Sequence, residues 1–411
     1  MKAISFLGLG NYEVTTFEYR GDKCRTCLFP VALCHFHRPA ELLVMVTEQA
    51  KKKWFDKLKE ELQPTGIVPE PVDIPEGHSI DDLWTIFHRL TDHLEEEEEL
   101  LFDITYSFRT LPFLAFLAAS YLRVVKRVNL KGVFYGAWEA RQPQSKPALP
   151  TDLSPVFDLS PFTELLSLTA ATDQFVKTGS AESLALLLRR TDSSSPLADS
   201  LMGIAQGLHL LRPAEVMKGA EALPNLINKA VPAVSETTPP IVSLIQRVNK
   251  EYGTFGLSSA TDFNDNAKAA LVRQLRMVKW YADKGQFVHA LSMAREWIPS
   301  LLCWHFAADP MDVREREDME LLLRGGVDKD RTTDTIVKQS PRLSEWEMLD
   351  NARRKKLTNL WGGTLKLAHL RNDVLHSGFR KNPRTAQEIA DDTRKVVEEL
   401  KAIADNWNLE N

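Results

Sequence analysis

The sequence predicts an α/β domain on a mostly parallel sheet, followed by a long all-α region. Over the first 160 or so residues, short apolar runs of strand length alternate with helical patterns, an order typical of parallel sheets covered by helices. Beyond Pro161 the apolar spacing is almost wholly helical. A chain of 411 residues has room for two or three domains. We therefore divide it into segments 1–160, 161–264 and 265–411.

The strands and helices of segment 1–160 follow in a regular order. Apolar runs predict strands at 3–9, 41–47, 66–74, 100–105 and 130–138. Helical patterns lie between them at 48–62, 79–99 and 112–128, where the acidic run 95–99 is expected to be a solvated helix face. Residues 142–155 are expected to form a loop. Ligands of such sheets bind beyond the carboxyl ends of the strands.

Residues suited to binding a nucleotide follow these strand ends. They are Gly8, Gly10, Asn11, Tyr12, Thr47, Thr105, Ser107, Phe108 and Arg109. Amides at a helix N-terminus, a hydroxyl and an arginine make a phosphate cradle, and Tyr12 and Phe108 could stack on bases. Taken alone, GLGNY at 8–12 would be a tight turn. It lacks the third glycine of a dinucleotide fingerprint, and no acidic residue ends the second strand, which argues against a nucleotide-dependent oxidoreductase.

The hexapeptide RNDVLH at 371–376 carries the clearest chemical signal. Arginine presents a planar fork of donors to phosphate oxygens, and histidine gives and takes protons near pH 7. On a helix Asn372 and His376 share the face away from the core, and Arg371 diverges from His376. Two such helices meeting across a dimer would bring Arg371 and His376 together, with Gly378 as the C-cap. The alternative is an ordinary helix with surface Arg and His side chains.

Two groups of residues could in principle bind a metal. Cys24, Cys27, Cys34, His35 and His37 could form a tetrahedral zinc site, although reduced structural thiols are the expected state. His369, Asp373 and His376 fall at i, i+4 and i+7 and could carry the divalent ion of a metal-dependent nuclease. We expect neither, and therefore no metal and no cofactor.

Composition limits the kind of partner. The formal net charge is -5 with 26% charged residues, so any contact with nucleic acid has to come from local patches. No apolar run approaches the length that spans a bilayer, and the N-terminal residues carry no signal-peptide cleavage site. We expect a cytoplasmic protein without membrane association.

These motifs resemble a known pair of domains. GLGNY, the strand into VTEQA, DITYSFRTLPF and VFYGAWEA make segment 1–160 similar to the Rossmann-like CARF domain of CRISPR-associated accessory proteins, in the group whose signature reads D-x-T-H-G-F-R. The region ending in RNDVLH makes 265–411 resemble the HEPN ribonuclease domain. Together they resemble a CARF-HEPN ribonuclease of type III CRISPR systems, with 161–264 as a helical linker region.

The resemblance implies a ligand and a reaction. A CARF homodimer would bind a cyclic oligoadenylate, with cyclic tetra-adenylate as the expected ring, and binding would activate the HEPN site. That site would cut single-stranded RNA without metal, leaving 2′,3′-cyclic phosphate and 5′-hydroxyl ends. His376 would act as general base or acid, Arg371 would stabilise the transition state, and Asn372 would orient either the phosphate or His376.

Some questions stay open at this level. Where the signature has His-Gly, this chain has Tyr106-Ser107, which leaves ring size and degradation of the activator undecided. RNA sequence preference and assembly of dimers into larger oligomers are also open. The alternative to a nuclease is a cyclic-nucleotide-binding regulator whose HEPN-like helices are inactive and serve dimerisation or partner binding.

Overall fold

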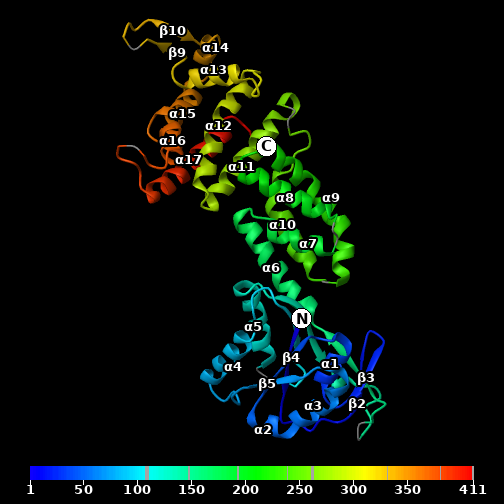
Figure 1. The fold of residues 1–411 in the computed structure, drawn as a ribbon. Coiled ribbons are helices and arrows are strands. Elements are labelled where there is room, and N and C mark those ends of the chain that lie inside the picture. The colour runs from blue at the N-terminus through cyan, green and yellow to red at the C-terminus, as the bar shows by residue number, and fades with distance from the viewer. Residues whose placement is uncertain are drawn as a thin grey trace. The chain divides into compact units, whose positions relative to one another are not determined.

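The computed structural model describes residues 1–106, 111–146, 149–191, 194–237, 239–260, 263–330, 332–379 and 381–409. The chain divides into two compact units, Met1–Leu166 and Ser167–Asn411 (Figure 1). The first unit contains the sheet and the second is helical, apart from one hairpin. The predicted fold class, an α/β domain followed by an α-helical region, is confirmed.

The first unit is built on an eight-stranded sheet in the order β3-β2-β8-β7-β6-β1-β4-β5. The strands are β1 (Lys2–Leu7), β2 (Thr15–Tyr19), β3 (Asp22–Thr26), β4 (Glu41–Val46), β5 (Pro69–Asp73), β6 (Glu99–Asp103), β7 (Asn129–Gly136) and β8 (Leu153–Asp158). Five of its pairings are parallel, and only β2–β3 and β7–β8 are antiparallel. The sheet is therefore mostly parallel, as the alternating pattern predicts.

Helices cover both faces of this sheet. One face carries α1 (Phe29–His37), α2 (Glu48–Ala50), a π-helical turn (Lys51–Phe55), α3 (Asp56–Leu62) and a 3₁₀ turn (Gln63–Thr65); the other carries α4 (Ile80–Asp92) and α5 (Leu111–Val125). In β1, Ala3 and Leu7 pack on the α1 side, while Ile4 and Phe6 pack on the α4 side. Because both faces are covered, the central strands read as continuous apolar runs.

Several predicted elements of the first unit need correction. Strands β2, β3 and β8 were not predicted from the sequence, and β8 begins inside the expected loop 142–155. Helix α4 ends at Asp92, so the acidic run 95–99 is not a helix face. Its carboxylates pair instead with cations near the amino ends of the strands: Glu96 and Glu97 with Arg127, Glu98 with Lys2, and Glu99 with Lys131. These ion pairs connect the run to residues at or near the amino ends of β1 and β7.

Helices make up most of the second unit. They are α6 (Ser160–Thr178, which begins in the first unit), α7 (Glu182–Thr191), α8 (Pro196–His209), α9 (Pro213–Thr237), α10 (Ile241–Tyr252), α11 (Phe263–Asp283), α12 (Phe287–His305), α13 (Val313–Leu323), α14 (Leu343–Met348), α15 (Asn351–Gly362), α16 (Leu367–Leu375) and α17 (Ala386–Asn406), with a 3₁₀ turn at Gly253–Phe255. The hairpin β9 (Val327–Lys329) and β10 (Ile336–Gln339) was not predicted. All four residues of β10 are exposed, so it lacks the apolar alternation that marks a strand.

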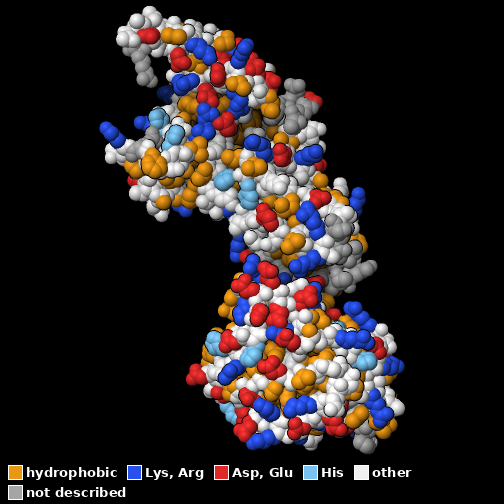
Figure 2. All heavy atoms as spheres, in the orientation of Figure 1, with side chains coloured by type: hydrophobic (Ala, Val, Ile, Leu, Met, Phe, Trp, Pro, Cys, Tyr) orange, Lys and Arg blue, Asp and Glu red, His pale blue; other side chains and the backbone are white. Residues whose placement is uncertain are grey.

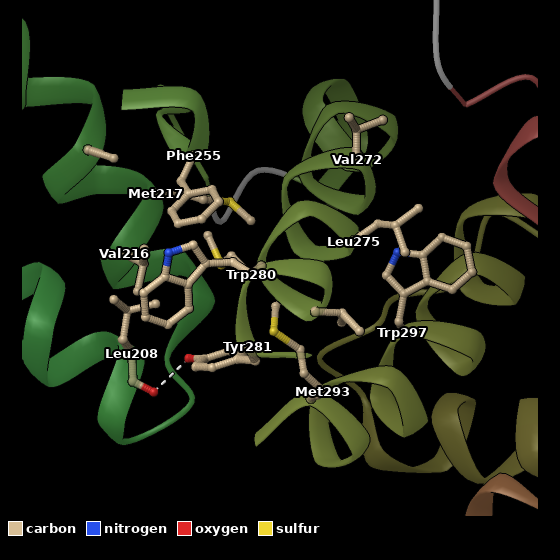
Figure 3. Close-up of a cluster of buried hydrophobic side chains, with 14 of the residues drawn as sticks. Leu208, Val216, Met217, Phe255, Val272, Leu275, Trp280, Tyr281, Met293 and Trp297 are labelled. Atoms are coloured by element: carbon tan, nitrogen blue, oxygen red, sulfur yellow. Dashed lines mark hydrogen bonds between the residues drawn. The ribbon is translucent and has the colours of Figure 1, made fainter. Parts of the chain in front are cut away.

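One hydrophobic core runs through the second unit (Figure 3). Trp280 and Tyr281 of α11 lie among side chains of α8, α9 and the 3₁₀ turn, including Leu208 and Phe255. The Tyr281 hydroxyl donates to the Leu208 carbonyl at 2.6 Å, and Trp280 Nε1 donates to a Glu251 carboxylate oxygen at 2.8 Å. Segments 161–264 and 265–411 thus contribute to the same core.

Replacing Trp280 with alanine should destabilise both segments together. Trp280 is 7% exposed, and Trp→Ala in a core costs about 3–5 kcal/mol. For a unit of this size that lowers the melting temperature by roughly 10 °C, measurable by circular dichroism. Trp84→Ala is the matched control, since Trp84 is 57% exposed. Loss of helicity in two separate steps in the second unit would show that the two segments fold independently.

Candidate functional site

A hollow of about 210 Å³ lies where β6 and β7 end. We call it the strand-end hollow. It is lined by Asn11, Tyr12, Glu13, Thr105, Tyr106, Tyr135, Gly136, Trp138 and Glu139. Because β1, β6 and β7 are parallel neighbours, the segments that follow them meet at one edge of the sheet. This is the edge at which the sequence predicts a ligand.

Aromatic rings form one wall of the strand-end hollow. Tyr12 stacks on Tyr106 with ring centroids 3.9 Å apart, and Trp54 lies against Tyr12 at 4.8 Å. The Gly8 N–H donates to the Tyr12 hydroxyl at 2.8 Å, and Trp54 Nε1 donates to the Gly10 carbonyl at 3.1 Å. Burial raises the pKa of Tyr12 to about 12, so its hydroxyl stays neutral. Tyr12 thus lies between Tyr106 and Trp54, and the three rings are held in place.

Backbone and side-chain bonds fix the second wall. The Thr105 hydroxyl accepts from the Gly136 N–H at 2.9 Å, which joins the ends of β6 and β7. Tyr106 donates its hydroxyl proton to the Cys27 carbonyl at 2.7 Å. The Tyr135 hydroxyl bonds to the Glu139 carboxylate. The Glu139 carboxylate is therefore already hydrogen-bonded to Tyr135, next to the space that a ligand would enter.

The predicted binding residues are only partly gathered around the strand-end hollow. Asn11, Tyr12 and Thr105 line it. Gly8 and Gly10 support it, because a Cβ on Gly8 would lie 3.0 Å from the Tyr106 carbonyl oxygen and one on Gly10 would lie 3.0 Å from a Tyr12 ring carbon. Thr47 does not line the hollow; it is buried, and its hydroxyl accepts from the Ala50 N–H at 3.3 Å as an N-cap. Ser107, Phe108 and Arg109 lie outside the described residues.

Several residues beside this hollow were not predicted from the sequence. They are Lys53, Trp54, Tyr135 and Trp138. Lys53 donates to the Leu9 carbonyl at 2.9 Å and to Asn11 Oδ1 at 2.8 Å, which places an exposed cation next to the glycine turn. A signal existed for Trp138, because it follows a strand end in GAWE. No such signal existed for Lys53 and Trp54. They belong to the π-helical turn Lys51–Phe55, and from there their side chains contact Leu9 and Gly10 of the glycine turn.

Asp103 is a buried carboxyl group at the end of β6. It is 0% exposed, accepts from the Thr105 N–H at 2.8 Å and bonds to the Ser5 hydroxyl. Burial raises the pKa of Asp103 to about 6, against the opposing effect of these hydrogen bonds. An unfolded aspartate has a pKa of about 3.9. The contribution of Asp103 to the stability of the folded protein is therefore fully present below about pH 4 and is lost as the pH rises through about 6.

Asp103→Asn should remove this loss of stability. The amide can keep both bonds, since Oδ1 still accepts from Thr105 and Nδ2 can donate to the Ser5 hydroxyl. The melting temperature of the variant minus that of wild type should increase by a few degrees when the pH is raised from about 4.5 to about 7.5. Thermal melts at both pH values measure it, with the exposed Asp56→Asn as control. An unchanged difference at both pH values would contradict the raised pKa.

Helix α16 carries the hexapeptide 371–376 and ends differently from the expectation. His376 is its C-cap, not Gly378. The Gly378 N–H donates to the Asp373 carbonyl at 3.1 Å and the Ser377 N–H to the Val374 carbonyl at 3.0 Å, the bonds of a Schellman motif. Ser377 takes the left-handed conformation at φ 55°, and Gly378 follows at φ 70°. The His376 side chain consequently sits exposed at the very end of the helix.

The predicted catalytic residues lie in two different environments. Asn372 and His376 are exposed, and Arg371 is half-buried. Arg371 Nη1 donates to Asn372 Oδ1 at 3.1 Å. Arg371 and Leu375 line a second hollow in which His376 takes no part. One chain therefore does not hold Arg371 and His376 in a single hollow.

Neither candidate metal set assembles. Asp373 is buried and its Oδ2 accepts from the Arg384 N–H at 3.1 Å, while His369 and His376 are exposed. Cys27 and Cys34 pack in the core of the first unit, and the His37 ring lies 4.3 Å from that of Phe134. Within the described ranges no three or more His, Cys, Asp and Glu side chains form a group that could hold a metal ion. Asp373 instead ties the chain after α16 back to the helix.

The surface carries mixed charge. Acidic and basic side chains are interspersed over the face shown in Figure 2, without one continuous basic stripe. Local contacts, rather than a broad positive field, would have to position a nucleic acid there. In the part of the chain that the structure describes, no helix combines the length and the apolarity needed to cross a membrane.

Two family models match this chain. Residues 2–139 match the CARF domain of CRISPR system endoribonuclease Csx1, and residues 164–259 match the second domain of CRISPR-associated protein MJ1674. The chain is 26% identical over 188 residues to CRISPR-associated protein MJ1674 of Methanocaldococcus jannaschii, a match that covers 44% of this chain and 28% of that protein. The first match takes in every strand and helix around the strand-end hollow. The chain thus carries an N-terminal CARF domain and is similar to CRISPR-associated proteins over both matched segments.

Proposed function

We propose that this protein is an endoribonuclease of type III CRISPR defence that cuts single-stranded RNA when its CARF domain binds a cyclic oligoadenylate. The observation that carries the proposal is the strand-end hollow, with its stacked Tyr12 and Tyr106, within the residues that match a CARF domain. The name of the matched family, an endoribonuclease, and the Arg371 to His376 motif support the nuclease part.

The activator would bind across a homodimer. A ring of adenylates with two-fold symmetry fits a two-fold axis, with one strand-end hollow from each protomer. Adenine bases would pack against the aromatic side chains that line each hollow, Tyr12, Tyr106, Tyr135 and Trp138, since every base has a face that aromatic side chains accept. Lys53, and Arg109 as predicted from the sequence, would pair with ring phosphates.

The reaction would be a metal-independent transesterification. The RNA 2′-oxygen forms a bond to the adjacent phosphorus, and the bond from phosphorus to the 5′-oxygen breaks. His376 of one copy either takes the proton of the 2′-hydroxyl while water protonates the leaving 5′-oxygen, or protonates that oxygen while water takes the proton of the 2′-hydroxyl. Arg371 donates to the phosphoryl oxygens in the transition state, and Asn372 holds the Arg371 guanidinium through the 3.1 Å bond. Two protomers would complete the site, because one chain separates Arg371 from His376.

Cleavage of a fluorescent single-stranded RNA in EDTA tests this function. Purified protein is mixed with cyclic tetra-adenylate, cyclic hexa-adenylate or a linear tetra-adenylate, and the RNA ends are analysed. We expect cleavage with one ring only, 2′,3′-cyclic phosphate products, and no cleavage of the 2′-deoxy analogue. Intact RNA with every ring, or cleavage only after a divalent metal is added, would rule the proposal out.

A further inference from the structure

The second hollow is the larger of the two and lies wholly within the helical unit. We call it the Arg371 hollow. It has a volume of about 650 Å³ and is lined by residues of α9, α11, α12, α13 and α16 together with residues 211–212, 260 and 310–311. This volume falls in the range of about 300–1,000 Å³ that organic ligands occupy in proteins.

Its walls are mostly apolar, with a few polar groups. Trp297, Met293 and Leu375 come from α12 and α16, and Met217 comes from α9. Gln274 and Ser292 add an amide and a hydroxyl from α11 and α12. Flat apolar walls with a small number of hydrogen-bonding groups suit a nucleobase, which has apolar faces and a polar edge.

The charged groups of this hollow fall into two sets. Arg316 is occupied, since it donates to Glu296 Oε2 at 2.7 Å and to Ser300 Oγ at 3.0 Å. Arg295 also pairs with Glu296, so this carboxylate is neutralised on both sides. Arg371 differs, because its Nε is buried and has no hydrogen-bond partner among the described residues. A buried guanidinium donor left unbonded is costly, and a ligand could satisfy it.

We propose that the Arg371 hollow holds the nucleobase of the RNA nucleotide whose 2′-hydroxyl attacks, and so sets the base preference of cleavage. This inference rests on the proposed function. The neutral base enters the apolar interior, where Arg316 and Glu296 are already paired with each other. Arg371 then lies between the base and the adjoining phosphate, within the span of one nucleotide. Gln274 and Ser292 read the edge of the base.

Two variants test the hollow directly. Ser292→Trp should fill it from a half-buried position, and Gln274→Ala should remove the amide that reads the base. With the activating ring at saturation, Ser292→Trp should lower kcat/KM on single-stranded RNA at least tenfold, and Gln274→Ala should flatten base preference across a randomised RNA library. Met348→Trp is the control, because Met348 is 85% exposed and outside the hollow. An unchanged preference in both folded variants overturns the proposal.

A readout without cleavage separates this inference from the proposed function. RNA carrying 4-thiouridine or 6-thioguanosine is photo-crosslinked to the full-length His376→Ala protein with the ring bound, and the peptides are identified by mass spectrometry. Crosslinks should fall on residues that line the hollow, within 211–217, 260, 274, 292–300, 310–316 or 371–375, and disappear with Ser292→Trp. Crosslinks elsewhere overturn the base site even if wild type cuts RNA. If wild type cuts nothing, the proposed function fails, and the crosslinks still report on the hollow.

Discussion

His376→Ala should lower the rate of activated RNA cleavage by about 10²–10⁴-fold and leave binding of the cyclic oligoadenylate unchanged. His376 is exposed at the C-cap of α16, so truncating it removes a proton carrier with little effect on packing. Single-turnover cleavage at saturating ring measures the rate, and calorimetry measures ring binding. His369→Ala, also exposed on the same helix, is the control and should retain activity.

Arg371→Ala should also lower the rate of RNA cleavage and leave ring binding unchanged. Even the conservative change Arg371→Lys should lower that rate. Arg371→Ala removes a transition-state donor, and losses of about 10²–10³-fold are typical of such donors. Arg371→Lys should recover little, because an ammonium lacks the planar fork and cannot reproduce the bond to Asn372 Oδ1. If either histidine or arginine variant bound the ring several-fold more weakly, the division into a sensing domain and a cutting site would be wrong.

Tyr12→Ala should weaken ring binding by the largest factor of any single change in the first unit. Stacking on an aromatic side chain is worth about 1–3 kcal/mol per base, and a homodimer would present Tyr12 twice to one ring. The expected loss of affinity is therefore roughly 30-fold or more. The change also removes the stack on Tyr106 and the acceptor of the Gly8 N–H. Isothermal titration with cyclic tetra-adenylate and cyclic hexa-adenylate measures it.

Tyr12→Phe separates the ring of Tyr12 from its hydroxyl. Phenylalanine keeps the stack but not the 2.8 Å bond from Gly8, so its affinity should stay close to wild type. Trp84→Ala, on the exposed face of α4, should bind normally. Wild-type affinity in Tyr12→Ala would mean that the ring does not use the strand-end hollow, and equal losses in both Tyr12 variants would assign the effect to the hydroxyl.

The buried strands of the first unit could be predicted from sequence because each is covered on both faces. In β1 and β4 successive apolar side chains alternate between the two cores, so both strands are mostly apolar, with Ser5 as a polar exception inside β1. Strand β3 gives no such signal: DKCRT is mostly polar and lies at the edge of the sheet. Strand β8 contains Pro155 and a half-buried pattern, so composition marks it as a loop.

The candidate sites were predictable where chemistry follows a strand end, as with Asn11, Tyr12 and Thr105. Trp54 reaches the same place through a π-helical turn, a local change of helical register that residue spacing does not encode. The Arg371 hollow brings residues 211 and 375 to one cavity. Contacts between residues so far apart in sequence depend on how the helices pack, and no sequence motif predicts them.

The core around Trp280 limits how this protein could exchange parts with others. A cut near residue 264 would leave α11 without the Leu208, Tyr252 and Phe255 side chains that cover it. The natural place for recombination is the N-terminal end of α6, close to where the unit Met1–Leu166 ends and the unit Ser167–Asn411 begins. A nuclease grafted onto a different sensor would have to bring the whole helical unit with it, so that α6–α10 would travel with the Arg371 site through evolution.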